Sequence, residues 1–312
     1  MRRPVFFNWD GLTSVLKLAT FAPPGASPRV GIVRGGWLLD AHAANPAVPA
    51  SMQDLLANWD AAKPHLDGLA EACTDKSALH RANDVRILPP TEPGRYLDFY
   101  SFEGHVKNAR AKRGLDVVPE WYQTPTYYNG NPYCFVGHGE PVRYPAGETQ
   151  RDYEMELAVV LSRTCRNLDS TDWKSAIAGF TILNDCSARA RQMPYAKVGM
   201  GPSYGKDFGK AIGPFIVTPE EVPDPGRIEL ATRVNGAEWS RGKMGEARYD
   251  WGAMLAFATK DQELRPGDVV GSGTFAGGCG YELDKFLQPG DVVEMDLAYD
   301  GKVLMTLRNP VV

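Results

Sequence analysis

Three prolines, Pro89, Pro90 and Pro93, fall within one short stretch of the 312-residue chain. Each proline fixes its own backbone and drives the residue before it away from helical geometry, so this stretch predicts a stiff, extended link. Single hydrophobic cores typically stop growing near ~250 to 300 residues, and a chain of this length can therefore form two domains. We expect a small N-terminal domain over residues 1–88 and a larger domain over residues 89–312.

The N-terminal segment has the pattern of a small α/β domain. Short apolar runs between proline and glycine turns predict strands at 15–21, 29–33 and 37–40. Ser51 is followed three residues later by Asp54, a pairing typical of a helix start. Beyond it, Leu55, Leu56 and Trp59 share one helical face, which we expect to cover the sheet.

The larger segment is predicted to be mostly β. A Pro-Gly-Asp-Val-Val sequence occurs at 266–270 and again at 289–293, and each copy predicts a turn followed by a strand. Residues 153–161 alternate and then become continuously apolar, as expected of a strand that enters a core. The predicted fold class is therefore α+β, with strands predominating.

Composition excludes several classes of protein. A hydrophobic content of 43% argues against disorder, and a net charge of −4 without a Lys/Arg cluster offers no field for nucleic acid or anionic lipid. The chain has no uninterrupted run of ~20 apolar residues, and its five cysteines are scattered without metal-finger spacing. We expect reduced thiols, a cytoplasmic location and a small-molecule partner, with no nucleic acid and no membrane.

Acidic residues recur in three separate segments. Asp98 opens an aromatic stretch that ends in His105; Glu154 and Glu156 are one residue apart; and Asp185 ends an apolar run. On a strand, Glu154 and Glu156 would point to the same face, roughly 7 Å apart. Such a pair can simply face water, but the buried-looking run that follows favours a cation between them, because burying unpaired carboxylates costs several kcal/mol.

An oxygen-only set of Asp98, Glu154, Glu156 and Asp185 suits a hard ion. We expect Mg²⁺, with Ca²⁺ or Mn²⁺ as alternatives, rather than zinc or copper. Such an ion can polarise a carbonyl group. His105, seven residues after Asp98, could act as the base that activates water.

These residues together resemble the fumarylacetoacetate hydrolase superfamily, over about residues 87–312. The resemblance rests on ordered motifs: Asp98-Phe-Tyr100 with His105, Glu154-x-Glu156, Asn184-Asp-x-Ser-Ala-Arg189 with Gln192, Gly205-Lys-Asp-Phe208, Gly271-Ser-Gly-Thr274, Tyr281-Glu-Leu283 and Thr306-Leu-Arg-Asn-Pro310. The chain departs from the family pattern at Gly209-Lys210, where Asp or Thr is frequent. The resemblance implies a mixed β-roll preceded by a small α/β domain, usually in a homodimer.

The resemblance also implies roles for individual residues. Asp98, Glu154, Glu156 and Asp185 would bind the metal, and His105 would be the general base oriented by Glu282. The remaining catalytic contacts would be Lys206, Arg189 and Gln192. The substrate pocket would be lined by Tyr100, Arg113, Tyr128 and Thr274.

The expected activity is metal-dependent hydrolysis of a carbon–carbon bond in a β-diketo acid. An acylpyruvate or a substrate like fumarylacetoacetate or fumarylpyruvate is expected, as in the breakdown of aromatic compounds. Related members of the superfamily decarboxylate oxaloacetate-like acids, hydrate 2-oxo-pentenoates or isomerise them on a similar metal site, and these activities remain alternatives. A binding protein without catalysis is a further alternative, which the presence of all four acids and His105 disfavours.

Overall fold

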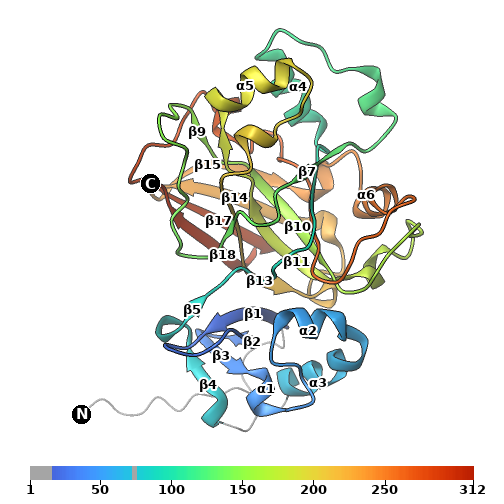
Figure 1. The fold of residues 1–312 in the computed structure, drawn as a ribbon, viewed down its shortest axis with the longest axis vertical. Helices are drawn as coiled ribbons and strands as arrows, with labels where there is room; N and C mark the ends of the chain where they lie inside the picture. Colours follow the sequence, from blue (N-terminus) through green and yellow to red (C-terminus); the bar gives the residue numbers. More distant parts are fainter. Residues whose placement is uncertain (1–15, 72–75) are drawn as a thin grey trace.

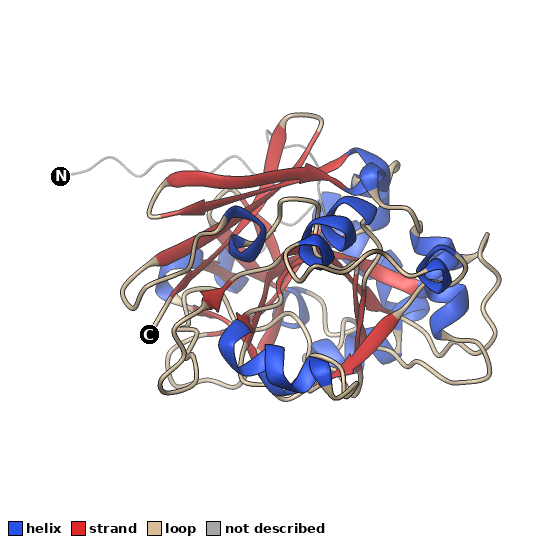
Figure 2. Cartoon of the chain, turned by 90° about the horizontal axis from the view of Figure 1, so that it is seen from above, coloured by secondary structure: helices blue, strands red, loops and turns tan. Residues whose placement is uncertain are grey.

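The computed structural model describes residues 16–71 and 76–312. Strands predominate and the helices are short (Figure 2), as the sequence predicts. The helices are α1 (Ala41–Ala44), α2 (Met52–Ala57), α3 (Trp59–Glu71), α4 (Glu103–Ala111), α5 (Arg189–Lys197), α6 (Trp251–Ala258) and α7 (Gly280–Leu283). None of the helices in the described residues combines the length and apolar character that crossing a bilayer requires.

One mixed sheet runs through both predicted domains. Its main path is β4 (Leu79–Arg81), β3 (Trp37–Asp40), β2 (Arg29–Arg34), β1 (Lys17–Ala22), β13 (Lys210–Val217), β11 (Ile177–Asn184), β10 (Met155–Leu161), β16 (Val269–Gly271), β6 (Tyr96–Phe99) and β7 (Tyr127–Gly130). Off this path, β5 (Arg86–Ile87) pairs with β1 and β8 (Phe135–Val136) with β13. The pairs β16–β6 and β8–β13 are parallel and the others antiparallel.

Residues of the larger segment form a second sheet of four antiparallel strands. Its order is β15 (Ala237–Lys243), β14 (Ile228–Val234), β17 (Val292–Tyr299) and β18 (Lys302–Pro310). A short pair, β9 (Arg151–Asp152) with β12 (Ser187–Ala188), lies near the site described below. The two Pro-Gly-Asp-Val-Val sequences lead into β16 and β17, so each does precede a strand.

Strand β10 is buried on both faces, which explains its continuous apolar sequence. Leu157 and Val159 belong to the core beneath the four-stranded sheet. Ala158 and Val160 point the other way, into a core shared with the N-terminal helices. Because side chains alternate along a strand, one strand serves both cores.

The N-terminal helices α1–α3 lie with β1–β4 at one end of the molecule, and α4 and α5 lie at the other end (Figure 1). Ser51 caps α2 as predicted, since its hydroxyl accepts the backbone N–H of Asp54 at 3.1 Å. The predicted strand over 15–21 is β1, although its first residue lies outside the described part. The thiols of Cys134, Cys165, Cys186 and Cys279 are free, and Cys73 is outside the described residues.

Candidate active site

A cavity of about 460 Å³ opens at the end of the molecule that carries α4 and α5. Every residue proposed for the site except Glu282 lines this cavity. They are Asp98, Tyr100, His105, Arg113, Tyr128, Glu154, Glu156, Asp185, Arg189, Gln192, Lys206 and Thr274. Glu282 lies directly behind His105.

Three carboxyl groups meet at the floor of the cavity. Ligand oxygens of Asp98, Glu156 and Asp185 lie within 4.8 Å of one another. Strand β16 lies between β6, which carries Asp98, and β10, which carries Glu156. Gly271 on β16 pairs with Asp98 on one side and with Ala158, two residues after Glu156, on the other. A Cβ atom at Gly271 would lie 2.6 Å from Asp98 Oδ1 and 3.1 Å from Glu156 Oε2, so only glycine leaves this space open.

This group of three carboxyls, the cradle, fits a divalent cation. Asp98 Oδ1 and Glu156 Oε2 are buried and have no hydrogen-bond partner among the residues that the structure describes. Burial and the negative charge of Asp185 raise the pKa of Asp98 to about 8. Burial and the carboxyls of Asp98 and Asp185 raise the pKa of Glu156 well above its usual value. An oxygen-only set with unpaired buried acceptors is what a hard dication binds.

Asp185 is surrounded by cations and phenols. Burial alone would raise its pKa, but Lys206 and Lys210 reverse this and lower it. Lys206 Nζ donates to Asp185 Oδ2 at 2.5 Å and Lys210 Nζ to Oδ1 at 2.8 Å. The hydroxyl of Tyr128 also donates to this carboxylate, at 3.0 and 3.1 Å. Asp185 is therefore ionised and held from several sides.

Glu154 lies beside the cradle and is bound to two cations. Arg189 Nη2 donates to Glu154 Oε1 at 2.5 Å, and Lys206 Nζ donates to Glu154 Oε2. Although burial opposes ionisation, these charges lower the pKa of Glu154. Glu154 is not among the three carboxyls whose oxygens converge within 4.8 Å, so its contact with a cation remains a proposal.

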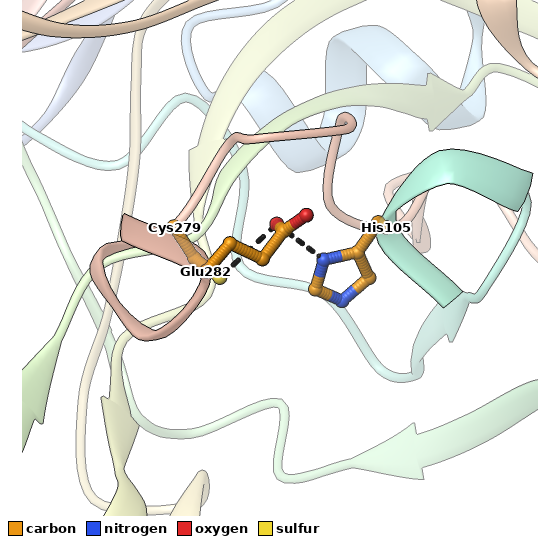
Figure 3. A group of neighbouring side chains, drawn as sticks. All are labelled: His105, Cys279 and Glu282. Carbon is orange, nitrogen blue, oxygen red and sulfur yellow. Dashed lines mark hydrogen bonds and ion pairs between the residues drawn. The ribbon is translucent and has the colours of Figure 1, made fainter. Parts of the chain in front are cut away.

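The predicted base and its partner are in contact. His105 on α4 and Glu282 on α7 lie 2.7 Å apart, from Nδ1 to Oε2, and Figure 3 shows them with Cys279. Although burial opposes it, the contact with His105 lowers the pKa of Glu282, which is therefore a carboxylate and only accepts hydrogen bonds. In a neutral ring, Nδ1 then carries the hydrogen and Nε2 is the basic nitrogen.

Glu282 is fixed by further donors. Its Oε1 accepts from Asn108 Nδ2 at 2.9 Å and from the backbone N–H of Gly277 at 3.0 Å. The thiol of Cys279 donates to Oε2 at 3.3 Å (Figure 3). Four donors hold this carboxylate, so the ring of His105 has one preferred orientation.

Sequence reasoning missed Asp152, which connects two parts of the site. It accepts from Arg189 Nε at 2.8 Å and from the backbone N–H groups of Gly280 and Tyr281 at 2.7 and 3.1 Å. Asp152 precedes Glu154 by two residues, so its membership in an Asp-x-Glu-x-Glu pattern was the signal available in the sequence. Cys279 was also missed, because no pattern linked it to the acids, and Lys210 was noted only as a departure from the family pattern and given no role.

Known proteins share the sequence pattern and the fold of this chain. The family described as fumarylacetoacetate (FAA) hydrolase C-terminal matches residues 95–312. The chain is 29% identical over 292 residues to the mitochondrial oxaloacetate tautomerase fahd2 of Xenopus laevis, covering 92% of this chain and 86% of that protein. Fumarylacetoacetate hydrolase from Exiguobacterium antarcticum superposes with a TM-score of 0.72 at 26% identity, over 95% of this chain and 99% of that one.

A further solved structure shares the fold. Maleylpyruvate hydrolase from Sphingobium sp. SYK-6, in complex with manganese(II) and pyruvate, has a TM-score of 0.73 at 22% identity, over 95% of this chain and 99% of that chain. The chain belongs to the fumarylacetoacetate hydrolase family. The predicted family and the predicted fold are thereby confirmed, and the protein is a member of an enzyme family.

Proposed function

We propose that this protein is a metal-dependent hydrolase that cleaves a carbon–carbon bond in a β-diketo acid. The observation that carries the proposal is the pair of His105 and Glu282 at the wall of a cavity whose floor is a carboxylate cradle. A base oriented by a carboxylate can take a proton from water, and water is the co-substrate of hydrolysis.

The proposed cofactor is Mg²⁺, with Mn²⁺ or Ca²⁺ as substitutes. Asp98, Glu156 and Asp185 would hold it, with Glu154 as a fourth candidate. When bound, the ion would polarise carbonyl oxygens of the substrate as a Lewis acid. A structural relative at 22% identity is described as a complex with manganese(II) and pyruvate, which supports a divalent ion and a 2-oxo acid here.

The other steps of the proposed reaction are carried out by residues of the chain. His105 Nε2 removes the proton from water, and Glu282 stabilises the imidazolium that results. Water attacks one carbonyl carbon, the bond to the neighbouring carbon breaks, and the electron pair leaves on the other fragment as an enolate. That fragment is then protonated at carbon by the proton that His105 took from water, which returns the imidazole to its neutral form. Arg189 and Lys206 line the cavity and offer positive charge for the developing anion.

The outer part of the cavity favours a substrate with a second carboxylate. Arg110 and Arg113 line it, and neither forms an ion pair within the described residues. A guanidinium group matches the geometry of a carboxylate. Arg113→Met should raise KM for fumarylpyruvate about tenfold or more and leave KM for an acylpyruvate without a second carboxylate nearly unchanged.

A second candidate is enolisation or decarboxylation of oxaloacetate. The likeness to an oxaloacetate tautomerase over 92% of the chain favours it. The same base could move a proton between carbon and oxygen without attack by water. Both reactions would use the cradle, so the products decide between them.

The deciding experiment uses metal-free protein to which Mg²⁺ or Mn²⁺ is returned. Fumarylpyruvate, a simple acylpyruvate and oxaloacetate are offered, and the products are identified. Pyruvate plus a second carboxylic acid, formed only with metal, would support hydrolysis. Carbon dioxide from oxaloacetate, or faster keto–enol exchange, without cleavage of diketones would replace that assignment.

Two variants test the mechanism. His105→Ala should reduce hydrolysis by ~10²- to 10⁴-fold if its imidazole activates water, and Asp185→Ala should abolish metal-dependent turnover. His65→Ala, on an exposed position of α3, is the matched control and should behave as the wild type. Full hydrolysis by His105→Ala together with none by Asp185→Ala would show that the base has been wrongly assigned.

A further inference from the structure

Lys210 is a completely buried cation that the proposed reaction does not use. It opens β13, and its side chain is 0% exposed. Its ammonium group donates to Asp185 Oδ1 at 2.8 Å and to the backbone oxygen of Lys206 at 2.9 Å. The rings of Tyr96 and Tyr128 have their centroids 5.3 and 5.7 Å away.

The two lysines that contact Asp185 approach it from different places. Lys206 lines the cavity and reaches Oδ2, whereas Lys210 does not line the cavity and reaches Oδ1 from the sheet. A cation that enters through the cavity can therefore compete with Lys206 for Asp185. It cannot displace Lys210, which is enclosed by the two tyrosine rings and the main chain.

We infer that Lys210 is a permanent internal counter-ion of the cradle: it holds the Asp185 carboxylate in place when no metal is present, and it weakens the affinity of the cradle for a dication. This inference rests on the metal site of the proposed function. The physical reason is that Lys210 and the dication bind the same carboxylate, so like charges oppose each other at short range in a buried setting. The protein should consequently keep its cradle formed while it exchanges metal.

The test compares the wild type with Lys210→Met, which has a similar length and no charge. Mn²⁺ affinity is measured by titration calorimetry, and thermal unfolding is measured with and without Mn²⁺. In the variant, the Kd for Mn²⁺ should fall by about tenfold or more, because the repulsion is removed. The Tm of the metal-free protein should fall, and Mn²⁺ should raise the Tm by more than it does in the wild type.

Two further variants separate charge from packing. Lys210→Gln keeps a hydrogen-bond donor without the charge and should shift the Kd in the same direction. Lys17→Met is the control for losing a partly buried lysine far from the cradle, since Lys17 Nζ donates to the backbone oxygen of Leu304. It should leave the Kd for Mn²⁺ unchanged.

Each outcome is decisive. If the wild type binds no Mn²⁺, the proposed metal site is wrong and this inference falls with it. If the wild type binds Mn²⁺ and both variants bind it equally or more weakly, the role of Lys210 is wrong and the proposed function stands. A Lys210→Met protein that folds only with Mn²⁺ would support the inference. Failure of both Lys210 variants to fold even with Mn²⁺ would overturn it, because the metal would then not replace the charge.

Discussion

Asp98 and Glu156 face a shared space in which a proton and the proposed metal ion would compete. Since the pKa of Asp98 is raised to about 8 and that of Glu156 is also raised, this pair of carboxyls retains a proton at pH 7 when no metal is bound, whereas Asp185 stays ionised. A dication needs deprotonated ligands, so its binding must release protons. The charge state of the cradle therefore depends on both pH and metal.

We predict that metal affinity strengthens as pH rises from 6 towards 8. For each proton displaced, the apparent Kd should tighten by up to ~10-fold per pH unit below the pKa of the ligand. Calorimetric titration of Mn²⁺ in two buffers with different ionisation enthalpies measures the protons released at pH 7. Release of no proton, or an affinity that is flat across this range, would contradict the raised pKa of Asp98.

The contact between His105 and Glu282 yields a second prediction. Glu282→Gln keeps a hydrogen-bonding side chain but removes the negative charge that stabilises the imidazolium, so kcat should fall by ~10²- to 10⁴-fold. Asn108→Ala is the control: Asn108 donates to Glu282 and does not contact the cradle. Its effect on kcat should stay below ~10-fold. Equal losses in the two variants would mean that orientation, and not charge, is what Glu282 supplies.

The acids were predictable as one group, because the spacing of Glu154 and Glu156 and the position of Asp185 after an apolar run are local patterns, and the structure brings them and His105 to one cavity. The contacts of Lys210 with Asp185 and of Asp152 with Gly280 were not predictable in the same way. They join residues 25 and 128 positions apart. Such contacts depend on the register of strands that no single segment encodes.

Among the elements, the short helix α7 depends on a close approach of backbone to backbone. A Cβ atom at Gly280 would lie 2.0 Å from the backbone oxygen of Lys285 and 2.7 Å from Asp152 Oδ1. Any side chain there would push α7 away, and α7 carries Glu282. The orientation of His105 is therefore coupled to Gly280, the smallest residue of the helix.

Gly280→Ala should destabilise the fold by about 1–3 kcal/mol through this overlap and should lower kcat because Glu282 moves. Gly68→Ala is the matched control. Gly68 lies inside α3, where an added methyl group would meet no atom within 4 Å, and alanine there should stabilise the helix by about 0.5–1 kcal/mol. Denaturant unfolding and steady-state kinetics measure both effects. A Gly280→Ala protein with unchanged stability and kcat would disprove the coupling.

Among helices, strands and turns, the turns were predicted well from the sequence. Asp268 and Asp291, the aspartates of the two repeated sequences, accept backbone N–H groups within their turns, from Arg265 and Gln288. The strands that follow belong to different sheets, β16 to the large one and β17 to the four-stranded one. A turn motif determines where a strand begins, but the strand with which it pairs depends on segments that are distant in the sequence.

In the whole molecule, the prolines at 89, 90 and 93 do not divide the large sheet between the two predicted domains. Strand β1 of the N-terminal segment pairs with β13 of the larger segment, through Lys17 with Val217 and Leu18 with Ile216. Thr20 Oγ1 also donates to the backbone oxygen of Pro90 at 2.9 Å. The division at residues 88 and 89 remains a proposal about domains, and the hydrogen-bonded sheet crosses it. The prolines predicted a link between the two segments, but local composition could not reveal a pairing 200 residues apart in sequence.

We predict that the chain unfolds as one cooperative unit. Calorimetry should give one transition whose van't Hoff and calorimetric enthalpies agree. The fragment 89–312 alone should lose the pairing partner of β13 and be less stable or aggregate. Two separated transitions, or a fragment as stable as the full chain, would show that the shared strands contribute little to cohesion.

The two tyrosines that hydrogen-bond the cradle have an optical consequence. Tyr96 donates its phenol hydrogen to Asp98 at 2.6 Å, and Tyr128 donates its own to Asp185. A phenol absorbs near-ultraviolet light at a wavelength that depends on the charge of its acceptor. Filling the cradle would thus change the tyrosine difference spectrum, and the protein carries its own chromophores for following metal occupancy in real time without a label.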